Sequence, residues 1–150
     1  MIEIKEALLK ECKSFVEKRL KNIEETISSH QKALQTETKS SAGDKHETGR
    51  AMLQLEMEKA GKQLLGVSKM NQILSQIDTA KKSNIANLGS VICTSNGNYF
   101  LSISAGKIEI EEGIYYAVSI ASPIGQLLLG KEEEGDFIIY SNKINIDSIF

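Results

Sequence analysis

Residues 3–35 decide the fold: EIKEALLKECKSFVEKRLKNIEETISSHQKALQ. Apolar side chains recur in this stretch at steps of three, four or seven, and only His30 interrupts the stripe. They are Leu9, Cys12, Val16, Leu20, Ile23, Ile27 and Leu34. This spacing is typical of one face of an amphipathic helix with a near-heptad repeat. Residues 3–35 are therefore predicted to form one long helix.

A second stripe of the same kind follows at residues 53–74, again with alternating steps of four and three. It runs through Leu53, Met57, Ala60, Leu64, Val67, Asn71 and Leu74. Neither segment contains the proline that would kink a helix, and a polar stretch at 36–47 separates them. Two matched stripes joined by a polar turn predict an antiparallel coiled-coil hairpin, which we place at residues 1–80.

Four residues inside the predicted hairpin depart from the apolar pattern. His30 and Asn71 lie on the two stripes, where a polar side chain is interpreted as fixing the register of the helices. Gly61 and Gly66 should each cost about 1 kcal/mol relative to alanine inside a helix. Close approach of the two helices is the compensation that we expect.

The pattern of the chain changes after residue 80. Residues 81–89 lose the helical period and are predicted to form a linker. Residues 90–150 then hold short runs rich in Ile, Val and Tyr, which are predicted to be strands. These runs lie at 90–94, 99–104, 107–110, 115–120, 137–140 and 143–149.

The turns of the second half suit a small sheet. Asn96-Gly97 and Glu112-Gly113 favour tight antiparallel connections. Pro123 and Gly130 frame one short helix, since proline favours the first helical turn and glycine the exit. The predicted fold class is α+β, with a helical hairpin followed by a small antiparallel β domain at residues 90–150 that carries one short helix.

Charge divides along the chain as the fold does. Residues 1–82 carry 15 Lys and Arg against 12 Asp and Glu, and residues 83–150 carry 3 against 8, which together make the chain's 18 and 20. The acidic second half is unsuited to coating free DNA or RNA. With 5% aromatic residues and no Trp, the chain is also a poor source of aromatic binding platforms.

Localisation follows from two absences in the sequence. No apolar stretch approaches the roughly 20 residues that cross a bilayer, and residues 1–10 lack the pattern of a secretory signal. We therefore expect a cytoplasmic protein. Cys12 and Cys93 lack CxxC spacing, and we interpret both as buried thiols acting as small apolar residues.

The candidate chemical site is a pair of carboxylates, Asp44 and Glu47, at the start of the second helix. An Asp at the N-cap with a Glu three residues later is a capping box, which stabilises a helix start by roughly 0.5 to 2 kcal/mol. The same spacing can direct carboxylate oxygens, which are hard ligands suited to Mg²⁺, toward one external point. Two carboxylates are too few to hold Mg²⁺ alone, so a partner would have to complete the coordination.

A stand-alone enzyme is not expected. Both histidines lie in the helical half, whereas Cys93 falls in a predicted strand, so a nucleophilic Cys–His pair is not indicated. Neither a GxGxxG string, a P-loop nor an HExxH motif occurs.

Two segments resemble the Gre transcript-cleavage factors of bacteria. Gly43-Asp44-Lys45-His46-Glu47 is similar to the acidic tip of that family, which lies between two long helices. Ser122-Pro123-Ile124-Gly125, continuing through Leu128-Leu129-Gly130-Lys131 to Gly135-Asp136, resembles the family's SPI…LLGK…GD segment. After Glu47 this chain has Thr48-Gly49-Arg50 where the family has Asn and then Glu-Tyr.

The resemblance implies a fold, a partner and a set of site residues. It implies an FKBP-like second domain docked at the secondary channel of bacterial RNA polymerase, with the coiled coil reaching toward the catalytic centre. Asp44 and Glu47 would then help to hold a Mg²⁺ shared with the polymerase, which cleaves the 3′ end of backtracked nascent RNA. Ser122, Pro123, Ile124 and Gly125 would lie at the docking loop.

Three hypotheses about function remain open from the sequence. The first is a transcription elongation factor that stimulates RNA cleavage by polymerase. The second is a polymerase-binding regulator of the same architecture that does not support cleavage, which the altered tip at Thr48-Gly49-Arg50 permits. The third is a coiled-coil interaction module in which Asp44 and Glu47 only cap a helix.

Overall fold

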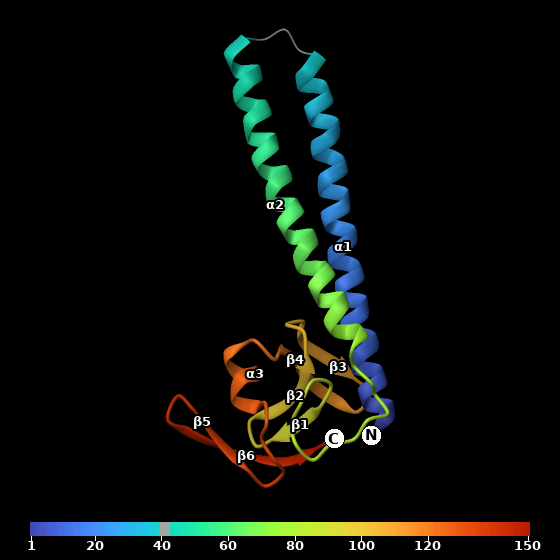
Figure 1. The fold of residues 1–150 in the computed structure, drawn as a ribbon, viewed down its shortest axis with the longest axis vertical. Coiled ribbons are helices and arrows are strands. Elements are labelled where there is room, and N and C mark those ends of the chain that lie inside the picture. Colours follow the sequence, from blue (N-terminus) through green and yellow to red (C-terminus); the bar gives the residue numbers. More distant parts are fainter. Residues whose placement is uncertain (40–42) are drawn as a thin grey trace. The chain divides into compact units, whose positions relative to one another are not determined.

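The computed structural model describes the backbone of residues 1–39 and 43–150, and the side chains of residues 1–36 and 48–150. It has two long helices, α1 (Ile2–Lys39) and α2 (Gly43–Ser75), followed by a six-stranded mixed sheet (Figure 1). The predicted α+β class and both long helices are confirmed. No helix in the described part of the chain has the length and apolar character that a membrane span requires.

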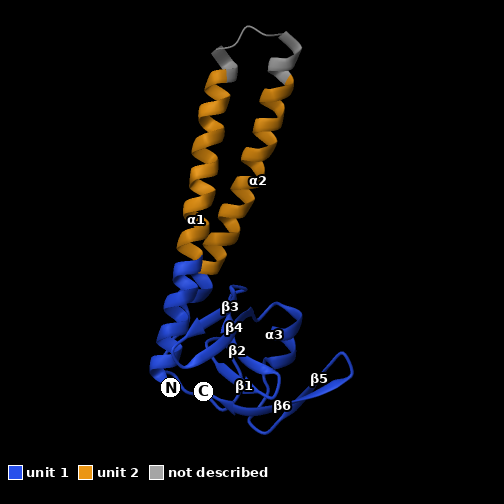
Figure 2. Cartoon of the chain, turned by 180° about the vertical axis from the view of Figure 1, so that it is seen from behind, with its two compact units in different colours: residues 1–15, 72–150 blue, residues 16–71 orange. Residues whose placement is uncertain are grey.

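The chain divides into two compact units that cut across both long helices (Figure 2). Unit 1 contains Met1–Phe15 and Gln72–Phe150, and unit 2 contains Val16–Asn71. Within unit 2 the two helices run side by side in opposite directions. Their facing positions bury apolar side chains of the predicted stripes, namely Val16, Ile23, Ala60 and Val67. The predicted boundaries at residues 1–80, 81–89 and 90–150 stay a prediction about how the chain is organised.

Three details of the predicted hairpin differ from the structure. Asn71 is exposed, so it does not fix the register from inside the helix pair. A Cβ placed at Gly61 or Gly66 would meet nothing within 4 Å, so the expected close helix approach is wrong. Leu8, rather than its neighbour Leu9, is fully buried, because the first turns of α1 face the sheet of unit 1.

All six predicted strands are present, with bounds shifted by one or two residues. They are β1 (Val91–Thr94), β2 (Gly97–Ser102), β3 (Gly106–Ile110), β4 (Gly113–Ser119), β5 (Asp136–Ile139) and β6 (Asn142–Ile149). The short helix α3 (Pro123–Leu128) connects β4 to β5 as predicted. The strand order is β3-β4-β2-β1-β6-β5.

The expectation of an antiparallel sheet is wrong at one pair of strands. β2 and β4 are parallel, with Tyr99 opposite Tyr116 and Ser102 opposite Ser119. β3 lies at the edge of the sheet and pairs antiparallel with β4. β4 therefore lies between β3 and β2, and it runs in the same direction as β2. Turn residues specify such local hairpins, but they do not specify which more distant strand becomes the neighbour.

The sheet is covered on both faces within unit 1. One face carries an apolar cluster that includes Ile92, Leu101, Leu128 and Phe137. Because side chains alternate along a strand, Phe100 and Ser102 of β2 face the other side. There the sulfur of Cys12 on α1 lies 3.6 Å from the hydroxyl oxygen of Ser102. The first turns of α1 therefore form the second cover of the sheet.

The segment that follows α2, residues 76–90, is hydrogen-bonded to two other parts of unit 1. Lys5 is only 4% exposed, and its ammonium group donates a hydrogen bond of 2.8 Å to the carbonyl oxygen of Lys81. Burial lowers the pKa of Lys5, although the charge of Asp78 opposes that effect. Further along, the Ala86 amide donates to the Lys131 carbonyl and the Gly130 amide donates to the Ala86 carbonyl, both at 2.8 Å. Residues 81–89 are thus attached to α1 and to the connection between α3 and β5.

Candidate functional site

The Ser122–Gly125 segment, predicted to contact a partner, builds the start of α3. Ser122 is the N-cap, with extended backbone angles of φ −72° and ψ 159°. Its hydroxyl oxygen accepts a hydrogen bond from the Gly125 amide at 3.1 Å and donates one to the Ser119 carbonyl at 2.6 Å. Pro123 follows in the first helical turn, where the missing N–H leaves no unsatisfied donor. Local capping chemistry therefore explains Ser122 and Pro123.

Gly125 is required by packing. It is buried, and a Cβ at this position would overlap the Ser119 carbonyl oxygen and approach the Cα of Ile120. Only glycine lets α3 lie this close to the end of β4. Of the four predicted contact residues, Ser122 and Gly125 have clear structural roles, whereas Pro123 is exposed and Ile124 is half-buried.

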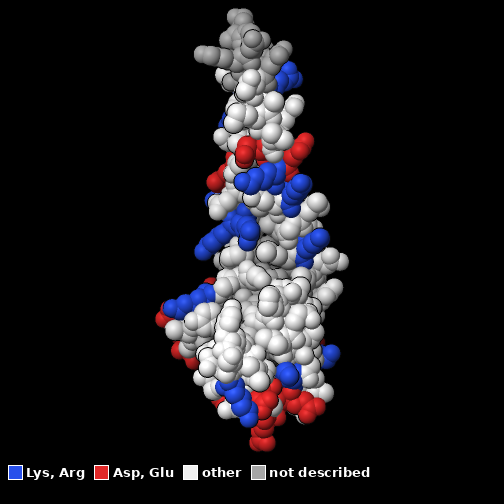
Figure 3. All heavy atoms as spheres, turned by 90° about the vertical axis from the view of Figure 1, so that its left-hand side faces the viewer, with Lys and Arg blue, Asp and Glu red and all other residues white. Residues whose placement is uncertain are grey.

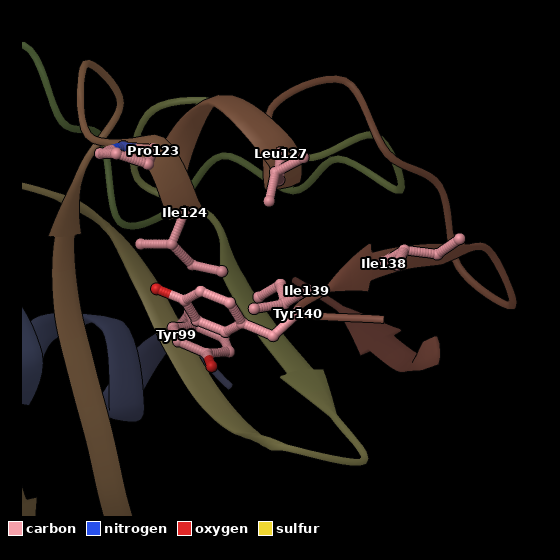
Figure 4. Close-up of a pocket in the computed structure, with 7 residues that line it drawn as sticks. All are labelled: Tyr99, Pro123, Ile124, Leu127, Ile138, Ile139 and Tyr140. Atoms are coloured by element: carbon pink, nitrogen blue, oxygen red, sulfur yellow. The ribbon is translucent and has the colours of Figure 1, made fainter. Parts of the chain in front are cut away.

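Pro123 and Ile124 border an apolar groove of about 500 Å³ in unit 1 (Figure 4). In the close-up they lie on α3 with Leu127, while Tyr99 projects from β2 and the end of the β5–β6 hairpin borders the far side. The residues from the hairpin are Ile138, Ile139 and Tyr140. None of the seven lining residues is charged. The structure therefore adds an apolar surface to Pro123 and Ile124 of the predicted docking loop.

Five of the lining residues were not predicted from the sequence: Tyr99, Leu127, Ile138, Ile139 and Tyr140. One signal was available in the run Phe137-Ile138-Ile139-Tyr140. A strand with one face in water alternates apolar and polar residues, and this run does not. Ile138 is 66% exposed and Tyr140 is 95% exposed.

Charged side chains are distributed unevenly on the molecule (Figure 3). In that view, Lys and Arg side chains are spread along the described part of unit 2. Unit 1 shows a broad area free of charged side chains, with Asp and Glu gathered at its lower edge. Side chains of both signs appear on both units in this view, so the difference in net charge between the two halves of the sequence does not form separate basic and acidic surfaces.

The predicted acidic pair lies where the structure gives backbone only. α2 begins at Gly43, which places Asp44 and Glu47 in its first two turns. Negative charge is favourable there because of the helix dipole. The side chains of residues 37–47 are outside the described part, so both the capping box and the metal role stay predictions. Among the described residues, no group of three or more His, Cys, Asp or Glu side chains could hold a metal ion.

The two cysteines are free thiols with different environments. Cys12 is fully buried, and loss of solvation raises the pKa of its thiol to about 11, although the hydrogen bond with Ser102 opposes this effect. Cys93 on β1 is half-buried. The interpretation of Cys12 as a small core residue is confirmed, and Cys93 is more accessible than expected.

Comparison with known proteins does not assign the chain to a family. No protein-family model matches it, and neither does any curated protein sequence.

Proposed function

We propose that this protein is a Gre-type transcription elongation factor. It binds the secondary channel of bacterial RNA polymerase and stimulates cleavage of backtracked RNA. One observation carries the proposal: two long helices run antiparallel in unit 2, the second begins at Gly43 just before Asp44 and Glu47, and a mixed sheet follows in the sequence with a helix that starts at Ser122–Gly125. The order of these parts is the one that the sequence resemblance implies.

In this proposal the two helices form a coiled coil, and the sheet of unit 1 belongs to an FKBP-like docking domain. Burial along the helices supports the coiled coil. Val16 and Ile23 are buried seven residues apart on α1, and Ala60, Val67 and Leu74 are buried at the same interval on α2. A seven-residue repeat of buried positions is the spacing that such a seam needs.

The protein supplies ligands rather than a complete catalytic site. Asp44 and Glu47 offer anionic oxygens, the donors that Mg²⁺ prefers. Carboxylates of the polymerase and phosphates of the RNA would complete the set of ligands, and the chemistry that the metal ion would supply is the hydrolysis catalysed by the polymerase. The protein is accordingly an accessory factor and not itself an enzyme.

A second candidate, the non-cleaving polymerase regulator, is favoured by Thr48-Gly49-Arg50. Arg50 brings a positive charge within one helical turn of Glu47, where the family resemblance would place other residues. An opposite charge nearby competes for the carboxylate that the metal ion needs. The third candidate is an interaction module without polymerase, in which the helix pair alone is functional.

The experiment that separates the three adds the protein to halted elongation complexes that contain labelled RNA and Mg²⁺. Shortening of the RNA from its 3′ end, dependent on the added protein, supports the elongation factor. Binding without shortening supports the non-cleaving regulator. Absence of binding to polymerase rules out both and leaves the interaction module.

A further inference from the structure

We infer that the groove between α3 and β5 is a docking site for an extended segment of a partner protein. The segment is apolar where it crosses the groove, and it carries Lys or Arg at the end that lies beside the start of β5. This inference goes beyond the proposed function and does not require polymerase. It rests on the open edge of β5, on the backbone of the β5–β6 turn, and on the charged residues that precede β5.

The open edge comes from the strand order. β5 is last in the sheet and pairs only with β6 among the described strands. Ile139 and Asn142 flank the two-residue turn between β5 and β6, and residues in that position form a hydrogen-bonded pair. Hydrogen-bonded and non-hydrogen-bonded pairs alternate along an antiparallel ladder, so the next hydrogen-bonded pair is Phe137 with Ile144. The N–H and C=O groups of Asp136 and Ile138 must then point away from β6. These groups can accept another strand.

The opposite edge of the sheet is protected in a way that β5 is not. On β3 the exposed residues include Lys107 and Glu109, whose charges discourage pairing with another strand. On β5 the only charged residue, Asp136, is paired with Lys143 of β6 at 3.2 Å. Ile138, at the centre of the free edge, is 66% exposed. The unprotected edge is the one that borders the apolar groove.

Tyr140 occupies a backbone conformation that does not suit tyrosine. Tyr140 and Ser141 form the two-residue turn with φ values of 47° and 67°, both in the left-handed region. Such turns favour Asn and Gly, and a bulky residue there is strained. Tyr140 is also 95% exposed, so packing among the described residues does not offset the strain. In this inference, the exposed ring of Tyr140 contacts the partner segment as an aromatic anchor.

Charge indicates which partner fits. The groove walls are uncharged, but exposed Glu132, Glu133 and Glu134 lie just before β5, separated from it by Gly135. Glu133 already accepts a hydrogen bond from the Ile149 amide at 3.0 Å, so Glu132 and Glu134 are the main charges for a partner. A segment with Lys or Arg beside these residues complements them. A second copy of this chain would instead bring another acidic segment to the surface. Basic flanking residues therefore distinguish the expected partner from self-association.

The test uses the full-length protein and two fluorescein-labelled peptides, KKRVTVTV and EEDVTVTV, measured by fluorescence anisotropy. We expect the basic peptide to bind about tenfold more tightly than the acidic one. In hydrogen exchange, the amide of Ile138 should gain protection when the basic peptide binds. Equal binding of both peptides, binding of neither, or an unchanged Ile138 amide would overturn the inference.

Variants on β5 and its turn identify the surface. Tyr140→Asn should raise the midpoint of thermal unfolding, because Asn suits the turn, and should weaken peptide binding about tenfold. Ile138→Pro removes the N–H group that points away from β6, so peptide binding should be lost while the pairing with β6 is kept. Ile138→Thr keeps that N–H group and should retain most of the peptide affinity. Leu65→Ser removes an apolar residue of matching exposure, 65%, from α2 and should have no effect.

Two results with these variants would contradict the inference. The first is peptide binding that survives both Tyr140→Asn and Ile138→Pro in proteins that retain the wild-type circular dichroism spectrum. The second is a dimer in sedimentation velocity that Ile138→Pro dissociates, since that result would make a second copy the occupant of the edge.

Discussion

The Cys12 sulfur on α1 and the Ser102 hydroxyl oxygen on β2 lie 3.6 Å apart, although ninety residues separate them in the sequence. Both residues are fully buried. The contact joins the first turns of the long helix α1 to the sheet face opposite α3. The beginning of α1 is therefore part of the core of unit 1.

The environment of Cys12 predicts low thiol reactivity in the folded protein. Both burial and a pKa near 11 suppress the thiolate that reacts with disulfide reagents. At pH 8, we expect Ellman's reagent to modify Cys93 first and Cys12 only after unfolding. A Cys93→Ala variant checks the assignment, since it should show almost no reaction until denaturant is added. Rapid modification of that variant under native conditions would contradict the burial of Cys12.

The same thiol predicts a loss of stability at high pH. The folded protein holds the Cys12 proton more tightly than the unfolded chain does, because its pKa rises from 9.0 to about 11. The stabilisation is thus complete below pH 9 and is lost as the pH rises from about 9 to 11, by about 3 kcal/mol at most. Urea unfolding at several pH values measures it. The stability of Cys12→Ala should decline less steeply over this range, and parallel curves for the two proteins would refute the prediction.

Most of the fold could be predicted from the sequence because its elements are set by local patterns. Apolar spacing identified both long helices, and Gly-containing turns separated the first four strands correctly. The parallel pairing of Tyr99 with Tyr116 was missed, since it depends on a contact between strands that are not consecutive. The burial of Lys5 could not be predicted either, because it depends on a hydrogen-bond acceptor that is distant in the sequence, the carbonyl oxygen of Lys81.

Less of the candidate site followed from sequence. Ser122 and Gly125 were recognised within a motif, but their capping and packing roles require the end of β4 at Ser119. The groove was missed because its walls come from β2, α3 and the β5–β6 hairpin, which only the folded sheet brings together. The unbroken apolar run that ends at Tyr140 was the one available signal, but the left-handed backbone of Tyr140 appears only in three dimensions.

Glycine substitutions provide a test of helix packing in unit 2. Nothing lies within 4 Å of a Cβ at Gly61 or Gly66, so alanine adds helix propensity without a clash. Gly61→Ala and Gly66→Ala should each stabilise the protein by up to about 1 kcal/mol in chemical denaturation. Gly125→Ala is the opposite control, since its Cβ would overlap the Ser119 carbonyl and should cost more than about 2 kcal/mol. A destabilised Gly61→Ala would indicate that the helices approach each other there after all.

Replacing two residues of the proposed docking loop should weaken polymerase binding. Pro123 is exposed and Ile124 half-buried at the groove, so Pro123→Ser with Ile124→Thr removes apolar contact area. We expect about a tenfold loss of affinity for polymerase, the size of effect that a central interface residue produces. Ile114→Thr, at a residue 42% exposed on β4, is the matched control. If both proteins fold and bind polymerase equally, the loop is not in the interface.

Asp44→Asn with Glu47→Gln should abolish RNA cleavage stimulated by this protein and leave its binding to polymerase intact. Amides keep the size of the side chains and can still accept a hydrogen bond at the helix start, so the fold should lose at most about 1 kcal/mol. The negative charge, however, is gone. A Mg²⁺ ion beside phosphate needs anionic ligands, and neutral oxygens replace them poorly.

The control for the acidic pair is Glu56→Gln with Glu58→Gln, which removes two charges from the same helix at described, exposed positions. That variant should cleave like the wild type. If the wild type and the Asp44/Glu47 variant cleave equally well, the metal role is wrong and the two carboxylates only stabilise the start of α2. If the wild type binds polymerase without cleaving, Arg50→Ala tests whether the positive charge beside Glu47 is the cause. Cleavage gained by that variant would make Arg50 the residue that separates a regulator from a cleavage factor.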